Sequence, residues 1–265
     1  MPTGSLSTAA LGMTAQQRMV DNIANNLANV STTGFKRSRI AFQDLFYQNI
    51  ATSKRGGGAR DVTNGSTSLQ IGHGARPVAT IRNFTQGPIQ ETGNPLDMAI
   101  NGEGFFQIEL PDGNIAYTRD GSFTLNANGT LVNTSGLPLA DQISIPEDAE
   151  AVSISKDGVI TARLSGSGVE IDLGQIELAK FINPAGLTAM GDNLYGETEA
   201  SGMPFIGIPG TEGFGMVQQT YLEESNVDVV TEMVQLIEAQ RAYEINSKMV
   251  QTAEEMMSMT NALKR

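Results

Sequence analysis

The sequence of 265 residues contains no cysteine, no tryptophan and only one histidine, His73. The lack of cysteine excludes disulfides, thiolate metal ligands and cysteine nucleophiles. One histidine is too little for a histidine metal site or a Ser-His-Asp relay, and its Gly-rich surroundings suggest a solvated or packing residue. The sequence therefore predicts no enzyme active site, no cofactor and no metal site.

Long apolar runs are also missing, since none approaches the roughly 20 residues of a membrane-spanning helix. The first basic residue is Arg18, and no apolar region follows a charged one at the N-terminus. This pattern predicts no cleaved signal peptide. We therefore expect a cytoplasmic protein, unless it is exported by another route.

Charged residues make up only 17% of the chain, and their distribution is uneven. Residues 1–60 hold seven Lys or Arg and two Asp, whereas the rest is strongly acidic and brings the net charge to −12. An acidic body argues against general nucleic-acid binding, which needs a basic face. Opposite charges on two segments instead favour head-to-tail contact between copies.

Apolar residues recur every seven positions near the N-terminus, as in the seam of a coiled coil. One row is Leu6, Met13, Val20 and Leu27, and a second, offset by three, is Ala9, Gln16, Ile23 and Val30. The pattern predicts a helix over about residues 5–30. Gly34 is placed to end it.

A second long helix is predicted over residues 226–263, which contain no Pro or Gly. Ser225 and Asp228 have the spacing of a capping box before it. Its apolar residues again recur every seven positions, with three more near the companion positions: Val229, Leu236, Tyr243, Val250 and Met257, and Met233, Ala239 and Ala253.

Between the helices, short alternating segments are joined by turn dipeptides, which predicts antiparallel hairpins. Asp120-Gly121 and Asn128-Gly129 separate expected strands at 114–119, 122–125 and 130–133, Asp157-Gly158 divides another pair, and residues 169–182 alternate over two strand lengths. The fold class is therefore α+β, with terminal helices pairing as a coiled-coil-like layer around a mainly antiparallel β body. The predicted domains are 1–34 with 225–265 (helical), 35–95 with 186–224 (extended linkers), and 96–185 (central β).

Two further patterns resemble functional motifs only superficially. The pairs Gly102/Gly104 and Gly213/Gly215 lack the full spacing of a phosphate-binding loop, so turn glycines are the better interpretation. The pairs Glu223-Glu224 and Glu254-Glu255 suggest acid/base chemistry, but adjacent side chains on a helix diverge, so solvated faces are favoured.

The flanks of the predicted helices carry Gln, Asn, Ser, Thr and Met rather than dense charge. Such flanks suit burial against further helices, and contacts that do not close into a ring produce a helical filament. A helical hairpin that stabilises only its own molecule remains the alternative.

Three segments, in this order, resemble signatures of the bacterial flagellar rod and hook proteins. They are ANNLANVSTTGFKR at 24–37, the stretch from FTQGPIQETG to NANGTLV at 84–132, and SNVDVVTEMVQ onward at 225–256. The resemblance implies a structural subunit of a helical tube that crosses the periplasm and transmits torque. It favours the distal rod, with the proximal rod paralogue as the alternative. A periplasmic cell-wall enzyme is an alternative from another class.

The resemblance also implies partners: further copies, proximal rod subunits, the hook protein, the surrounding ring proteins and the flagellar type III export apparatus. The helical rows become the expected assembly interface, in which the amides of three asparagines fix register between subunits. Local capping at the helix end is the alternative for these amides, mainly for Asn29. The expected interface comprises Leu6, Met13, Val20, Ile23, Asn25, Asn26, Leu27, Asn29, Val30, Val229, Met233, Leu236, Tyr243, Val250 and Met257.

Residues 48–75 are rich in Gly, Ser and Thr, which predicts an extended linker. Because a straight shaft must resist bending, we expect this segment to stiffen contacts between subunits. Its basic side chains would face an acidic neighbour: Lys54, Arg55 and Arg60.

Overall fold

The computed structural model describes residues 3–50, 69–165 and 170–263. These residues divide into two compact units. We call residues 1–25, 38–81 and 230–265 the helical unit, and residues 26–37 with 82–229 the β body. The predicted three-domain division stays a prediction. Within the described residues, neither helix is long and apolar enough to cross a membrane.

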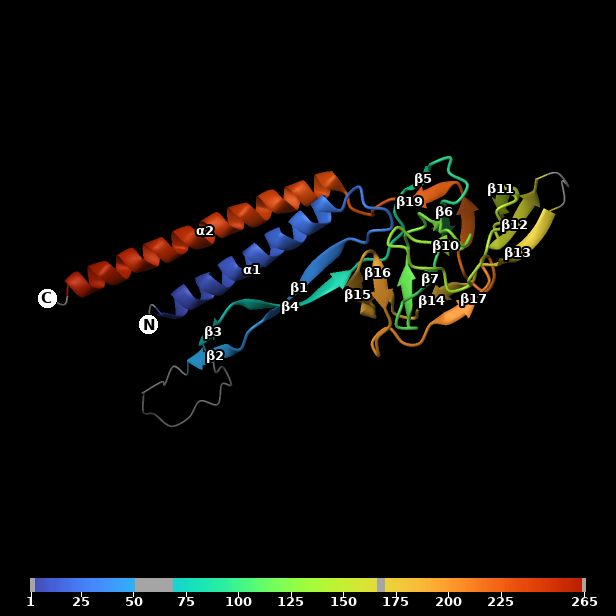
Figure 1. The fold of residues 1–265 in the computed structure, drawn as a ribbon. Coiled ribbons are helices and arrows are strands. Elements are labelled where there is room, and N and C mark those ends of the chain that lie inside the picture. The colour runs from blue at the N-terminus through green and yellow to red at the C-terminus, as the bar shows by residue number, and fades with distance from the viewer. Residues whose placement is uncertain (1–2, 51–68, 166–169, 264–265) are drawn as a thin grey trace, which may run out of the picture. The chain divides into compact units, whose positions relative to one another are not determined.

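The helical unit contains both long helices and an extended hairpin (Figure 1). Helix α1 covers Thr3–Ala28 and helix α2 covers Val229–Ala262, close to the predicted limits. The hairpin comprises β1 (Ser38–Asp44), β2 (Tyr47–Ile50), β3 (Leu69–Gly72) and β4 (Ala75–Arg82), with β1 paired to β4 and β2 to β3. The predicted linker 48–75 thus has strands at both of its ends. Lys54, Arg55 and Arg60 lie outside the described residues.

The two helices approach each other closely at Gly12, where a Cβ atom would lie 3.0 Å from Nδ2 of Asn246. The α1 rows are protected, with Ala9 and Ile23 buried and Leu6, Met13 and Val20 half-buried. On α2 the protected face includes Leu236, Ala239, Val250, Ala253 and Met257. The described geometry does not establish a regular coiled coil along the helices.

The start of the hairpin is fixed to α1 by a reciprocal pair of hydrogen bonds. Asn22 donates through Nδ2 to the Ser38 carbonyl at 2.8 Å, and the Ser38 hydroxyl donates to Asn22 Oδ1 at 2.8 Å. His73 lies half-buried in the turn between β3 and β4, where no catalytic grouping surrounds it in the described residues.

The β body is built of small antiparallel sheets, as predicted. The Asp157-Gly158 turn joins β11 to β12, and β13 completes a three-stranded sheet; the largest sheet has the order β15-β16-β8-β7. The strands of the whole β body are β5 Ile89–Glu91, β6 Met98–Asn101, β7 Phe106–Glu109, β8 Ile115–Thr118, β9 Thr124–Leu125, β10 Leu131–Val132, β11 Ala149–Ile154, β12 Val159–Leu164, β13 Glu170–Gln175, β14 Leu178–Lys180, β15 Thr188–Gly191, β16 Leu194–Gly196, β17 Phe205–Gly207, β18 Met216–Gln219 and β19 Tyr221–Glu223. A 3-10 turn, η1, lies at Pro184–Gly186.

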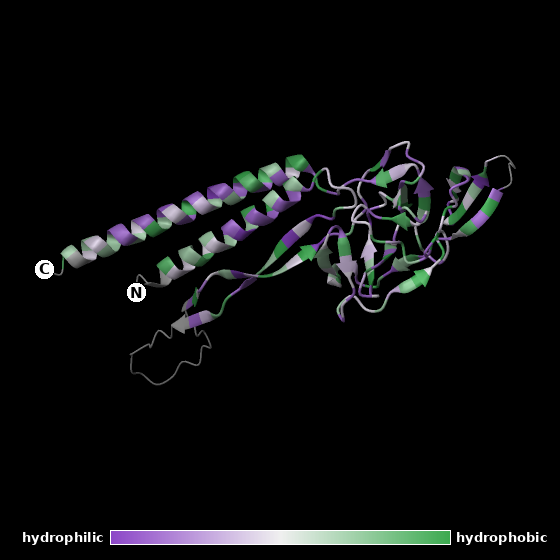
Figure 2. Cartoon of the chain, in the orientation of Figure 1, coloured by the Kyte–Doolittle hydropathy of each residue, from purple (hydrophilic) through white to green (hydrophobic). Residues whose placement is uncertain are grey.

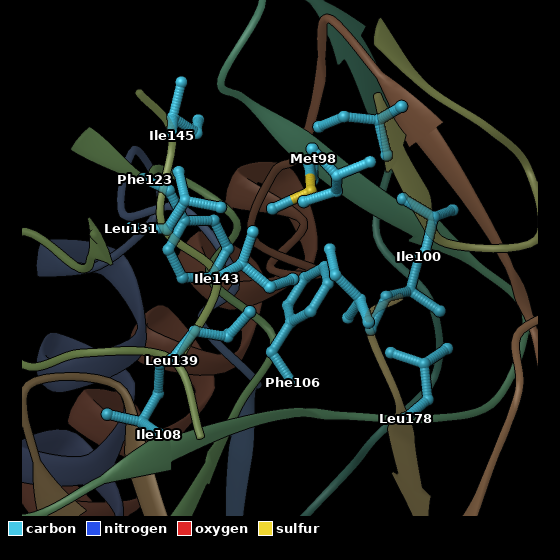
Figure 3. Close-up of a cluster of buried hydrophobic side chains, with 14 of the residues drawn as sticks. Met98, Ile100, Phe106, Ile108, Phe123, Leu131, Leu139, Ile143, Ile145 and Leu178 are labelled. Carbon is cyan, nitrogen blue, oxygen red and sulfur yellow. The ribbon is translucent and has the colours of Figure 1, made fainter. Parts of the chain in front are cut away.

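One continuous apolar core holds these small sheets together (Figure 3). Phe106 and Phe123 pack edge to face, with ring centroids 5.4 Å apart. A second cluster is aromatic and joins Phe105, Tyr117 and Tyr195 to Phe181. The burial of these large apolar and aromatic side chains is the main source of stability for the β body.

The four glycines singled out in the sequence are structural. A Cβ on Gly102 would lie 2.9 Å from the Cα of Gly215, and the Gly215 amide donates to the Glu103 carbonyl at 2.7 Å. Gly104 and Gly213 have positive φ angles of 144° and 82°. The two pairs therefore let neighbouring backbones meet, as turn glycines do.

Asp141→Asn is expected to stabilise the β body slightly at neutral pH. Burial raises the pKa of Asp141; a hydrogen bond that its carboxylate accepts from the Glu177 amide acts in the opposite direction, and the charge of Glu177 raises the pKa further. A raised pKa means that the ionised carboxylate disfavours the folded state once the pH exceeds that pKa. We expect the variant to melt about 1–2 °C higher at pH 7, and the difference to vanish below the ordinary pKa of 3.8. Equal melting temperatures at pH 7 would contradict this; Asp112→Asn, at an exposed turn, is the control.

Candidate functional site

Within the β body, the segment that follows α1 and the segment that precedes α2 meet around a buried group of charges, which we call the junction. It consists of Lys36, Arg119 and Glu223, at relative exposures of 0%, 4% and 1%. Lys36 comes from the loop after α1, Arg119 follows β8, and Glu223 ends β19. The residues are far apart in sequence, so the folded topology alone brings them together.

Lys36 is the centre of this group. Its Nζ donates to Glu223 Oε1 at 2.5 Å and to the Thr85 carbonyl at 2.8 Å. The Gly87 amide also donates to Glu223 Oε1, at 2.9 Å. Burial lowers the pKa of Lys36, and the Glu223 charge acts in the opposite direction. A buried ion pair of this kind specifies which segments must adjoin.

Arg119 supplies the second cation. It donates to the carbonyls of Ile100 and Gly102 at 3.3 and 2.5 Å and lies 3.6 Å from Glu223 Oε2. Its guanidinium also lies over the Phe105 ring, 5.6 Å from the centroid. Burial lowers its pKa, against the charges of Glu223 and Glu103.

Further hydrogen bonds, outside the ion pairs, hold the same two segments. The Thr33 hydroxyl donates to Asp120 Oδ1 at 2.8 Å, and Asn193 donates to the Thr33 carbonyl at 3.0 Å. Asn226 accepts from the Arg37 amide at 2.7 Å and donates to the carbonyls of Asn83 and Thr85. Residues 33–37 and 223–226 are thus held next to each other within the β body.

These contacts correct two sequence predictions. Glu223 is buried in an ion pair, not on a solvated face, because Lys36 compensates its charge. Ser225 does not cap α2, since Asn226 is held by the junction and the helix begins only at Val229. The Ser225 hydroxyl is buried without a hydrogen-bond partner in the described residues.

Gly34 does not end α1 either, because the helix stops at Ala28. Gly34 has a φ angle of 67°, and a Cβ there would lie 2.6 Å from the Asp120 amide nitrogen. Because glycine has no Cβ, the loop at Gly34 can pack directly against the backbone at Asp120. Its own amide donates to the Glu223 carbonyl at 2.8 Å.

Gly34→Ala is therefore expected to destabilise the protein by about 1–3 kcal/mol, because positive φ and a backbone clash act together. Gly113→Ala is the matched control, since Gly113 has a φ angle of 78° but no atom within 4 Å of the added Cβ. Urea unfolding of both variants measures the difference. Equal losses would show that the close approach contributes nothing.

The predicted interface residues lie in different surroundings. Asn26 is 1% exposed within a single chain, whereas Asn25 is exposed. Asn29 Oδ1 accepts a hydrogen bond from the Thr32 hydroxyl at 3.2 Å, a contact between two side chains of the loop after α1. Val30 lies beyond α1, Leu27 is half-buried, and Val229, Met233 and Tyr243 are exposed. Sequence reasoning missed the junction, whose members show no local pattern.

Family models match three parts of the chain in the order of the motifs. The flagella basal body rod protein model matches residues 6–36, the flagellar hook protein FlgE/F/G D1 domain model matches residues 99–162, and the flagellar basal body rod FlgEFG protein C-terminal model matches residues 218–263. The junction residues Lys36 and Glu223 fall in the first and last of these.

Full-length relatives agree with the models. The flagellar basal-body rod protein FlgG of Borreliella burgdorferi is 49% identical over 98% of both chains. FlgG of Bacillus subtilis is 40% identical over 98% of this chain and 99% of its own, and the rod protein FlgF of Caulobacter vibrioides is 36% identical over 91% and 89%. This chain belongs to the flagellar basal-body rod protein family.

Proposed function

We propose that the chain is the structural subunit of the distal rod of a bacterial flagellum. Copies polymerise through the helical unit into a tube that transmits torque from the motor to the hook. The relatives at 45–49% identity are FlgG rod proteins, and the match to FlgF, a further rod protein, is weaker at 36%. This difference favours the distal over the proximal rod. Membership of this family identifies a structural protein and not an enzyme.

The observation that supports polymerisation best is a second apolar row on α2. Apart from the protected face, α2 exposes large apolar side chains at spacings that place them on one side of the helix. Apolar bands recur along its whole length in Figure 2. We call these residues the exposed row: Val230, Val234, Ile237, Ile245, Met249, Met256, Met259 and Leu263.

An exposed row of this length needs a partner. A 34-residue helix is roughly 50 Å long, and large apolar side chains exposed at intervals along such a length favour an interaction with a partner. A helix of a second copy supplies a matching apolar surface, and contacts repeated in one direction build a filament. In this assembly we expect Asn25, which is exposed on α1, to hydrogen-bond to another subunit, whereas Asn26 is buried within its own chain.

The proposal includes partners and an export route. The rod subunit would contact proximal rod subunits, the hook protein and the surrounding rings, after secretion through the flagellar type III apparatus. Imaging tests this directly: basal bodies purified from cells with a labelled copy should show label between proximal rod and hook. Label confined to the proximal end would identify the proximal paralogue, and absence from basal bodies would refute a rod function.

The Gly-rich segment gives a separate prediction that rests on its composition. We propose that Lys54, Arg55 and Arg60 contact the acidic body of a neighbouring subunit, where each exposed ion pair contributes at most about 1 kcal/mol. Repeated along the tube, such contacts resist bending. Deletion of residues 50–65 should leave subunits that polymerise into a more curved tube, measured by electron microscopy. A tube as straight as that of the unaltered chain would show that the segment does not stiffen the tube.

A further inference from the structure

The junction carries more positive than negative charge. Lys36 and Arg119 share one buried carboxylate, Glu223. Two side-chain atoms of this group, Arg119 Nε and Glu223 Oε2, have no hydrogen-bond partner among the described residues. Two cations against one carboxylate leave a net positive charge in this group, which favours the binding of an anion at the nearby surface.

A cavity of about 470 Å³ adjoins Arg119 within the β body. A second arginine, Arg82, also lines it, and its guanidinium lies 5.6 Å from the centre of the Tyr195 ring. Glu103 is the acidic residue among those that line the cavity, and it is paired with Lys180 at 2.6 Å. Asn83, Gln86 and Asn183 contribute polar groups, and Phe84 an apolar wall. The cavity therefore carries a net positive charge from its two arginines, because the one carboxylate that lines it is already paired.

We propose that this cavity binds a carboxylate side chain of a second copy of the chain, which the Arg82 guanidinium holds by hydrogen bonds and the buried charge of Arg119 attracts. A carboxylate matches the planar fork of a guanidinium and accepts two hydrogen bonds from it. The second copy is the favoured source because the chain has 29 Asp and Glu against 17 Lys and Arg, and copies adjoin in a rod. The inference rests on the proposed function, but the chemistry of the cavity does not.

The chemistry of the cavity is tested first on the full chain as a monomer. Arginine Nε–H signals of the isotope-labelled protein are followed by NMR while sodium acetate replaces sodium chloride at constant ionic strength. We expect saturable shifts at Arg82 and Arg119, weakened at least tenfold in Arg82→Gln. Arg163→Gln removes the same charge from an exposed position on β12 and should leave the titration unchanged. The absence of any saturable shift would overturn the carboxylate assignment.

The source is tested in assembled tubes by crosslinking. The chain has no cysteine, so Ala185→Cys, exposed at the edge of the cavity, carries a short photo-crosslinker at a single place. We expect a crosslink to an Asp- or Glu-containing peptide of another copy, at least fivefold weaker when Arg82→Gln is added. Asn114→Cys, away from the cavity, should not give this product.

The remaining outcomes separate the two proposals. Acetate binding together with tubes that form but give no such crosslink would mean that the cavity takes a free anion only, which overturns the second copy as its source. Equal tube formation and equal crosslinking by Arg82→Gln would also overturn it. If the unaltered chain never forms tubes and never enters basal bodies, the proposed function fails, and with it a rod neighbour as the source, while the acetate titration still decides the chemistry.

Discussion

Glu223→Gln is expected to lower the free energy of unfolding by about 3–5 kcal/mol. The substitution keeps the shape of the side chain but leaves Lys36 and Arg119 without a counter-charge in a buried site. The neutral amide also cannot accept equally well from both Lys36 and the Gly87 amide, which share Oε1. Removing one member of a buried pair costs far more than the pair itself contributes.

Urea unfolding followed by tyrosine fluorescence measures this loss, since the chain has no tryptophan and Tyr117 and Tyr195 are buried in the β body. Glu224→Gln is the matched control. Glu224 is the exposed neighbour of Glu223, so its substitution should change the free energy of unfolding by less than about 0.5 kcal/mol. Adding Lys36→Met to Glu223→Gln should recover part of the loss. A loss below about 1 kcal/mol in the single variant would show that the junction charges are solvated.

Charge in the exposed row of α2 is expected to abolish polymerisation while leaving the monomer intact. Ile237→Asp and Met249→Asp place a carboxylate on a surface that is 56% and 49% exposed in the single chain. The monomer tolerates this, but burial of an unpaired charge between subunits costs several kcal/mol. The concentration needed for polymerisation should rise more than about 100-fold.

Gln251→Asp adds the same charge at an exposed polar position of α2 and should leave assembly nearly unchanged. Leu236→Asp provides a second contrast, because this half-buried residue should also weaken the helical unit of the monomer. Sedimentation measures assembly, and far-UV circular dichroism monitors the fold. Normal polymers from Ile237→Asp and Met249→Asp would place the interface elsewhere.

Local patterns were sufficient to predict the elements of this fold. Uninterrupted heptads indicate α1 and α2, and the Asp157-Gly158 turn indicates the β11–β12 hairpin, because both depend on residues close in sequence. The limits of α2 were less predictable. Asn226, three residues before the helix begins at Val229, is held by Arg37 and Asn83, which lie more than 140 residues away.

The candidate site was not predictable for the same reason. Lys36 and Glu223 are 187 residues apart, and each resembles an ordinary surface charge in its local context. Only the folded β body, which brings Lys36 and Glu223 together, shows that the two charges compensate each other. The exposed row of α2 was likewise hidden, since the heptad pattern draws attention to the protected face.

The junction also bears on how such a chain can change size during evolution. The Gly34 amide donates to the Glu223 carbonyl, and the Asn226 amide donates to the Phe35 carbonyl at 3.4 Å, so the chain enters and leaves the β body side by side. Such neighbouring ends are typical of a domain inserted into a host. Loops of the β body that do not belong to the junction can therefore be lengthened or shortened without separating the two points of attachment. A single helical unit can in this way carry β bodies of different sizes.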